Sequence, residues 1–337
     1  MTRQEGLGFK VTRYTFIGVL TGKTMKMKAL DFTPSKLFRG DGCNLLVGTQ
    51  GEIIKLDMNY SAIGRYVKPF PSTISEGIMI DDTWVGFWVD QEFRHSRMGA
   101  FDLTEELLDG ESRDKLRNSF TNKYSEIRNP YGHIESVVKP NGALWSRILD
   151  NEPLAIGKYN SNLIFSTRTG GIYSIDLEAN EIWRAEFPVW PELGEISSEN
   201  AIIAICGTDE YIYLWSEGGG IAVINPTDGE IISTKIIEIN EKISNVIFSK
   251  KGGWFIIFHE GEIGQMKSID DELTIFNTGS PVIDAIYDNG AWKWTGWRQD
   301  GKLMKGDQSI VSRDDIGVGI SGELVITNDG IWDNFRA

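Results

Sequence analysis

Apolar and polar residues alternate along most of the chain, in short runs that meet at glycine-containing turns. The segment NLIFSTRTGGIYSIDLEANEIWRAEF (residues 162–187) alternates, turns at Gly170 and Gly171, alternates again and ends in a run that carries Trp183. Alternation with a period of two residues predicts β-strands that bury one face. Glycine at the turn supplies the positive φ that a tight hairpin requires. The segment is therefore expected to form three antiparallel strands.

The pattern of two alternating runs around a glycine recurs along the chain. We expect its centres at Gly51, Gly171, Gly220, Gly261, Gly301 and Gly330, with a stretched version centred near Gly99. The centres are separated by 48, 72, 49, 41, 40 and 29 residues. Most of these spacings are close to the roughly 40–50 residues of a four-stranded propeller blade. The shortest step still holds four short strands, whereas the 72-residue step requires an insertion. The repeat predicts an all-β ring of stacked blades.

A second element follows the hairpin in some of these units. The segments GALWSRIL (142–149) and NEIWRAEF (180–187) each carry a tryptophan followed closely by an arginine, and GEIISTKII (229–237) is a version without the tryptophan. Preceded by GGIYSID, this pattern resembles the blade of the WD40-like and quinoprotein-like β-propeller superfamilies. The resemblance covers residues 40–337 as a pattern, and it implies an architecture rather than an activity.

The two cysteines limit what the resemblance implies. Cofactor-bearing members of the quinoprotein-like group carry adjacent cysteines and a calcium-binding acidic constellation, whereas Cys43 and Cys206 lie far apart and neither has a neighbouring cysteine. Their spacing does not indicate a disulfide framework or a structural zinc site. The resemblance therefore implies the fold without the redox chemistry, and we expect no cofactor and no metal.

The two ends of the sequence indicate how the ring closes. Only IWDNFRA follows Gly330, and an open ring would expose two sheet edges. The strand-like segment TRYTFIGVLTGKTMKMKALDF near the N-terminus is therefore expected to pair with the C-terminal strand. We predict a single β-propeller domain over residues 1–337 with seven four-stranded blades. Six blades stay open as an alternative, as do eight if Gly22 centres a hairpin of its own. Even spacing and the lack of a linker argue against two packed β-domains.

Residues 103–141 interrupt the repeat, between the third and fourth strands expected for blade two. Asp102 and Glu105 match a capping box at the start, and Gly110 is expected to divide the first half into two short helices. Two interpretations of this partly helical insertion stay open. It is either a lid that packs on the ring edge or a loop that binds a partner.

The charge and hydropathy of the chain limit its partners. A formal net charge of −14 repels phosphates and anionic lipid unless a local basic patch overrides it, which argues against a nucleic-acid partner. No stretch approaches 18 apolar residues, so no transmembrane helix is expected. The N-terminus has no apolar run long enough for a signal peptide. These features predict a cytoplasmic protein without a membrane partner.

Residues typical of catalysis do not form a recognisable motif. The histidines, His95, His133 and His259, show no HxH, HExxH or Cys/His spacing. The GxSxG elbow of serine hydrolases and the nucleotide-binding P-loop are both missing. The acidic pairs fall in apparent turns, where aspartate satisfies local backbone donors. We therefore interpret the chain as a non-catalytic scaffold. The alternative is a propeller hydrolase or lyase that uses carboxylates in the central channel.

A candidate binding surface combines the cationic segment EFRHSR of blade two with the basic residues of the insertion. Such a cluster could receive a carboxylate, so we expect a protein or peptide partner, with an acidic segment as the favoured type. In FPVWPELG a tryptophan lies in a proline-flanked loop, where we expect it to be exposed, as tryptophans at interface hot spots are. The predicted partner-binding residues are Arg94, His95, Arg97, Arg113, Lys115, Arg117, Tyr131, His133 and Trp190.

Overall fold

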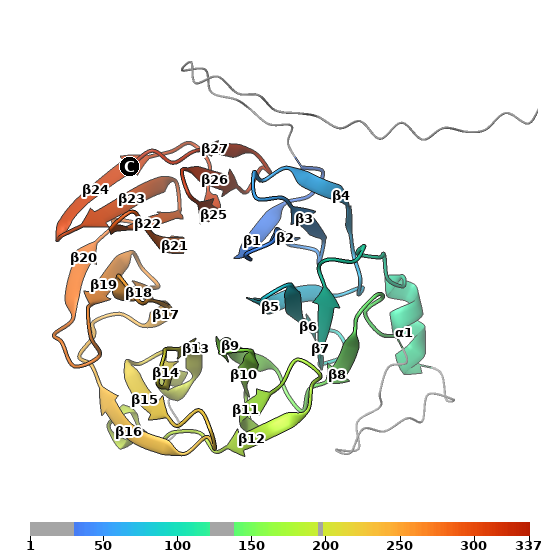
Figure 1. The fold of residues 1–337 in the computed structure, drawn as a ribbon, viewed down its shortest axis with the longest axis horizontal. Helices are drawn as coiled ribbons and strands as arrows, with labels where there is room; N and C mark the ends of the chain where they lie inside the picture. The colour runs from blue at the N-terminus through green and yellow to red at the C-terminus, as the bar shows by residue number, and fades with distance from the viewer. Residues whose placement is uncertain (1–29, 122–137, 195–197) are drawn as a thin grey trace, which may run out of the picture.

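Seven antiparallel sheets stand around a central opening in the order of the chain (Figure 1). The computed structural model describes residues 30–121, 138–194 and 198–337. Within this part, six sheets have four strands and the last has three, and in every sheet the neighbouring strands are consecutive in sequence. The arrangement is a β-propeller with seven blades, which confirms the prediction from the repeat.

Each of the first four blades is a meander of four strands. Blade one contains β1 (Pro34–Arg39), β2 (Asn44–Gly48), β3 (Ile53–Leu56) and β4 (Ala62–Val67). Blade two contains β5 (Thr73–Ile80), β6 (Thr83–Asp90), β7 (His95–Asp102) and β8 (Trp145–Ile148). Blade three contains β9 (Pro153–Tyr159), β10 (Asn162–Thr167), β11 (Gly171–Ile175) and β12 (Glu181–Ala185). Blade four contains β13 (Ile202–Gly207), β14 (Ile212–Ser216), β15 (Gly220–Ile224) and β16 (Ile231–Ile236).

The remaining blades continue the same meander. Blade five contains β17 (Ile243–Ser249), β18 (Gly253–Phe258), β19 (Glu262–Met266) and β20 (Thr274–Asn277). Blade six contains β21 (Val282–Asp288), β22 (Ala291–Gly296), β23 (Gln299–Met304) and β24 (Asp307–Ser312). Blade seven contains β25 (Gly317–Ser321), β26 (Leu324–Thr327) and β27 (Trp332–Asn334). The connection between blades three and four holds two short 3-10 helices, η1 (Pro191–Leu193) and η2 (Ser198–Asn200).

Burial decreases from the middle of a blade to its outer edge. Every residue of β18 is buried, and its sequence GWFIIF is almost continuously apolar. The sequence DQSIVS of β24 is almost entirely exposed. The second strand of a blade is covered on both faces by the neighbouring blades, so it does not need a polar face. The fourth strand borders solvent.

Large aromatic rings fill the wedges between blades. Phe255 of blade five stacks on Trp292 of blade six with ring centroids 4.7 Å apart. The ring centroids of Phe87 in blade two and Phe165 in blade three lie 5.8 Å apart. Blades diverge from the centre outward, so bulky rings are needed to fill the widening space. The buried tryptophans of the strands include Trp84, Trp88, Trp215, Trp254, Trp292, Trp294 and Trp332.

Two of the expected hairpin centres are wrong. Gly99 lies inside β7 and Gly301 lies inside β23, whereas the turns before those strands contain Arg94 at φ 48° and Arg298 at φ 58°. Arginine adopts the left-handed conformation at these two turns, so they lack the glycine that marks the other hairpins. Gly301 is instead required within its strand, because a Cβ atom there would collide with the ring of Trp294.

The insertion leaves blade two between β7 and β8 and contains α1 (Arg113–Thr121). The first of the two expected helices is absent from the described residues 103–112. There the chain runs along the β4–β5 connection, and the Gly110 amide donates to the Lys68 carbonyl at 2.8 Å. This extended path also buries Leu107, which joins Leu116 of α1 in the core of blades one and two. Tertiary packing has overridden local helix propensity.

Blade seven packs directly on blade one and closes the ring. Leu37 and Leu46 of blade one share a hydrophobic cluster with Ile326 and Trp332 of blade seven. The Arg39 Nε donates to the Ile320 carbonyl at 2.7 Å. Most of the N-terminal segment that was expected to pair with the C-terminal strand, residues 12–32, falls outside the described residues, and its described end, residues 30–32, forms no strand. The first described residue is already beside blade seven, because the Leu30 amide donates to the Gly330 carbonyl at 3.2 Å. In the described part of the chain, no helix has the length and apolar character needed to cross a membrane.

Candidate functional site

One face of the ring is built from two kinds of loop, the turns between the second and third strands and the connections from one blade to the next. We call it the loop face. Backbone hydrogen bonds join the two kinds of loop around the ring. Arg168 donates to Glu152, Glu217 to Ala201 and Trp297 to Pro281, each at 2.9 Å. The loops therefore form a fixed platform, on which binding residues are commonly carried.

Ion pairs within the same region neutralise the predicted cations of the insertion. Arg113 pairs with Asp90, and its Nη2 lies 2.7 Å from Glu92. Arg117 reaches Glu92 at 3.1 Å, and Lys115 pairs with Glu111. Burial opposes ionisation of Asp90, but hydrogen bonds from Arg113 and the Phe93 amide outweigh it and lower the pKa of Asp90. These contacts leave little net positive charge to attract an acidic segment.

Two of the predicted residues in β7 lie inside the blade. His95 is 7% exposed, and burial, together with the charge of Arg97, lowers its pKa to about 4. Its ring meets Phe120 of α1 edge-on, with centroids 5.4 Å apart. Arg97 is fully buried and donates to Ser146 Oγ at 2.6 Å. Arg94, in the turn before β7, is exposed. Tyr131 and His133 lie outside the described residues.

The expectation that Trp190 is exposed is wrong. Its side chain is 2% exposed, and its Nε1 donates to the Ile221 carbonyl at 3.2 Å. Gly220 makes this packing possible, because a Cβ there would lie 2.5 Å from the indole. Two large apolar side chains of the loop face do project, Val189, 69% exposed, and Trp297, 53% exposed. The sequence signal for Trp297 is the short turn between the runs AWKWTG and QDGKLM, a turn whose two residues, Trp297 and Arg298, include no glycine.

Two adjoining pockets of the loop face surround Asp90 beside α1. The first has a volume of about 600 Å³ and reaches from His95 and Phe120 to the β8–β9 connection at Asp150. The second has a volume of about 570 Å³ and lies between Arg113 and the β4–β5 connection. The pocket volumes match those of small-molecule sites. The structure therefore brings part of the predicted cluster to the border of a concave surface, with the charge of Arg113 already paired.

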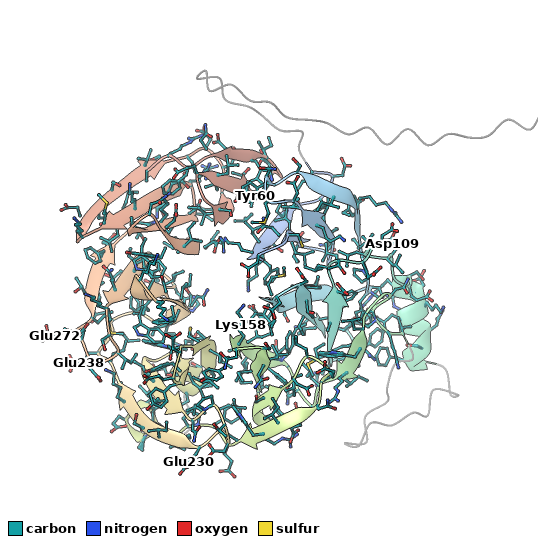
Figure 2. The ribbon with its side chains drawn as sticks, in the orientation of Figure 1. Tyr60, Asp109, Lys158, Glu230, Glu238 and Glu272 are labelled. Carbon is teal, nitrogen blue, oxygen red and sulfur yellow. The ribbon has the colours of Figure 1, made fainter. Side chains whose placement is uncertain are left out.

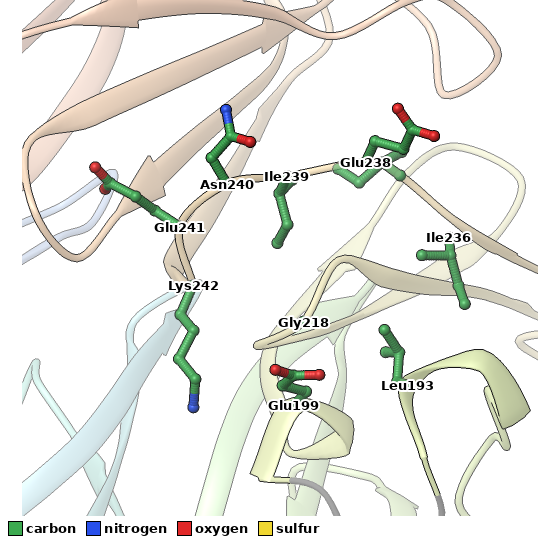
Figure 3. Close-up of a pocket in the computed structure, with 10 residues that line it drawn as sticks. Leu193, Glu199, Gly218, Ile236, Glu238, Ile239, Asn240, Glu241 and Lys242 are labelled. Atoms are coloured by element: carbon green, nitrogen blue, oxygen red, sulfur yellow. The ribbon is translucent and has the colours of Figure 1, made fainter.

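A third pocket, of about 610 Å³, lies at the junction of blades three, four and five, and we call it the blade-four pocket (Figure 3). Its walls come from the β16–β17 connection, residues 237–242, and from the connection between blades three and four. Figure 3 shows Ile239 extending toward Glu199 across the pocket, with Leu193 and Ile236 on the other side. No sequence pattern marks this pocket, because its residues come from four separate segments between residues 193 and 242.

The central channel contains a smaller pocket of about 340 Å³ among the first strands of the blades. Lys36 and Glu76 pair with each other in it. Lys158 lies beside the opening (Figure 2), where its Nζ donates to the Met79 carbonyl at 3.0 Å. Within the described residues, no group of three His, Cys, Asp or Glu side chains is arranged to hold a metal. Among the residues that line this pocket, Glu76 is the single carboxylate, whereas the enzyme alternative requires several carboxylates that converge.

Comparison with known proteins identifies the fold class. No protein-family model and no curated protein sequence matches the chain. The β-propeller domain of Cps50 (Swd1) from Myceliophteria thermophila is similar in structure, with a TM-score of 0.63 and 10% identity over 94% of this chain and 100% of that one. The computationally designed Ika8 protein gives a TM-score of 0.58 and 11% identity over 93% of this chain and 98% of that one. This chain is a β-propeller protein, and the low identities extend the likeness no further than the fold.

Proposed function

We propose that this chain is a non-catalytic scaffold that holds a partner protein or peptide over its loop face, with α1 at the border of the interface. One observation carries the proposal: exposed apolar side chains and pockets occur together on one rigid face. Trp297 and Val189 project from it, and the blade-four pocket includes half-buried leucine and isoleucine side chains in its lining. Tryptophan is enriched among the residues that dominate binding energy, and exposed apolar groups beside pockets are typical of interaction sites.

The hydrogen-bonded loops support this function energetically. Association carries an entropic cost for every loop that must be ordered, and that cost is small for a preorganised surface. Two hydrogen bonds hold the turn that carries Trp297. The Trp297 amide donates to the Pro281 carbonyl at 2.9 Å, and Ser280 Oγ donates to the Trp297 carbonyl at 3.2 Å. A partner can therefore bury the indole without ordering the backbone beneath it.

The test is affinity capture from an extract of the native host, with immobilised wild-type protein compared with the Trp297→Ala and Arg94→Glu variants. Mass spectrometry quantifies the captured proteins. A partner that covers the loop face should be retained at least tenfold less by the Trp297→Ala variant, since truncation of a central tryptophan costs about 2 kcal/mol or more. Arg94→Glu tests whether the interface extends to blade two.

The matched control is Met58→Ala. Met58 is 52% exposed and lies in the β3–β4 loop, on the opposite face of the ring. The Met58→Ala variant should retain the partner as well as the wild-type protein does. Equal capture by all variants, or equal loss with the Met58→Ala variant, would contradict binding through the loop face.

A further inference from the structure

We infer that the blade-four pocket binds a short basic segment with aliphatic neighbours, one that places a lysine or arginine side chain against the carboxylates and apolar side chains against the isoleucines. This inference rests on the proposed scaffold function and names the chemistry of the partner segment. It differs from the expectation of an acidic partner, which depended in part on the cations Arg113, Lys115 and Arg117, and the structure pairs these three with carboxylates.

The apolar part of the pocket comes from four half-buried side chains, Leu193, Ile236, Ile237 and Ile239. The turn between β14 and β15 lies close against them. Gly219 adopts φ 87°, and a Cβ at this position would lie 3.2 Å from Ile239 Cδ1. At Gly218 a Cβ would lie 2.6 Å from the Cβ of Glu199. The two glycines therefore let three separate segments meet around one concave surface.

The polar part of the pocket is strongly acidic. It contains Glu199, Glu238 and Glu241 against a single cation, Lys242. That lysine is already engaged, because its Nζ lies 2.9 Å from Glu217, outside the pocket lining. Glu241 accepts a hydrogen bond from the Glu260 amide at 3.1 Å, a neutral donor that does not cancel its charge.

The excess of carboxylates decides the sign of the partner. Glu238 is exposed at the rim, and Figure 2 shows it projecting from the outer edge of the ring. The carboxylates would repel an anionic segment as it approached. They would attract a cationic segment and raise its association rate. A volume of about 610 Å³ lies within the range of drug-sized ligand sites, which suits a few residues of an extended segment.

The probe is a fluorescein-labelled peptide, Leu-Lys-Leu-Lys-Leu with neutral ends, and its counterpart is Leu-Glu-Leu-Glu-Leu. Fluorescence anisotropy at 150 mM salt measures the Kd of each peptide with the full chain. The lysine peptide should bind, the glutamate peptide should not, and Glu238→Lys should raise the Kd at least fivefold. Glu238 is exposed, so this substitution leaves the fold intact.

The control for general attraction to an acidic protein is Glu230→Lys. Glu230 is exposed in the same blade, in the β15–β16 loop on the opposite face. Its replacement by lysine changes the net charge by the same amount as Glu238→Lys does. The Kd of the Glu230→Lys variant for the lysine peptide should stay within twofold of the wild-type value. Equal weakening by both variants, or no binding of the lysine peptide to the wild-type protein, would overturn the inference. If the Glu238→Lys variant still captures the native partner that the Trp297→Ala variant loses, the pocket assignment fails while the scaffold function stands.

Discussion

A buried ion pair between blades six and seven offers the sharpest test of how the ring is held together. Arg313 lies in the β24–β25 connection and is almost fully buried. Its Nη1 lies 2.9 Å from Asp300 Oδ1, and its Nη2 lies 3.2 Å from Asp333 of β27. The second oxygen of Asp300 accepts the Arg336 amide at 3.0 Å. One guanidinium therefore connects β23 with the last strand of the chain.

We predict that Arg313→Met destabilises the protein by about 3–5 kcal/mol, because it leaves the carboxylate of Asp300 buried without a cation. For 337 residues, an unfolding entropy of about 2.1 cal/mol/K per residue amounts to about 0.7 kcal/mol/K, so Tm should fall by about 4–7 °C. Burial already raises the pKa of Asp300. Loss of the arginine raises it further, so the deficit should be smaller at pH 5 than at pH 7, where a protonated Asp300 no longer needs a partner.

Calorimetry at both pH values measures the effect, together with the double variant in which Asp300→Asn accompanies Arg313→Met. Removal of both charges should restore most of the lost stability, since the neutral pair leaves no uncompensated ion. Lys115→Met is the control, because the exposed pair with Glu111 contributes less than about 1 kcal/mol. A fall in Tm below about 1 °C for Arg313→Met, or a double variant as unstable as the single one, would refute this reasoning.

Three further predictions concern acid stability, the insertion and the N-terminus. Because the pKa of His95 is lowered to about 4, the unfolded chain binds the extra proton as pH falls from 6.5 to 4, and the folded state should lose about 3 kcal/mol of stability. The pH dependence of Tm should therefore be flatter in the His95→Gln variant than in the wild-type protein. Deletion of residues 105–139 removes the buried side chains of the insertion and should lower Tm by more than about 5 °C. An unchanged melting curve would show that the insertion does not cover the core. Removal of residues 1–29 should lower Tm if they close the last blade as their sequence predicts, and equal Tm values for the full and shortened chains would dismiss that role.

The alternation of the sequence was sufficient to predict the ring. A period of two residues and glycine at the turns are local properties, and each blade repeats them within about 40–50 residues. The seven blades and the position of the insertion followed from this repeat. The two misplaced hairpins show the limit of the signal, because an arginine at positive φ leaves no glycine to find.

Only the tertiary structure decided which side chains are available for binding. Trp190 and Trp297 both lie in short loops, yet one is covered by blade four and the other is exposed. Arg113 is cationic in sequence but is paired with Asp90, 23 residues away. The blade-four pocket joins segments that the sequence keeps apart. Strand formation depends on neighbours along the chain, whereas exposure and net local charge depend on neighbours in space, and those are set only when the blades pack.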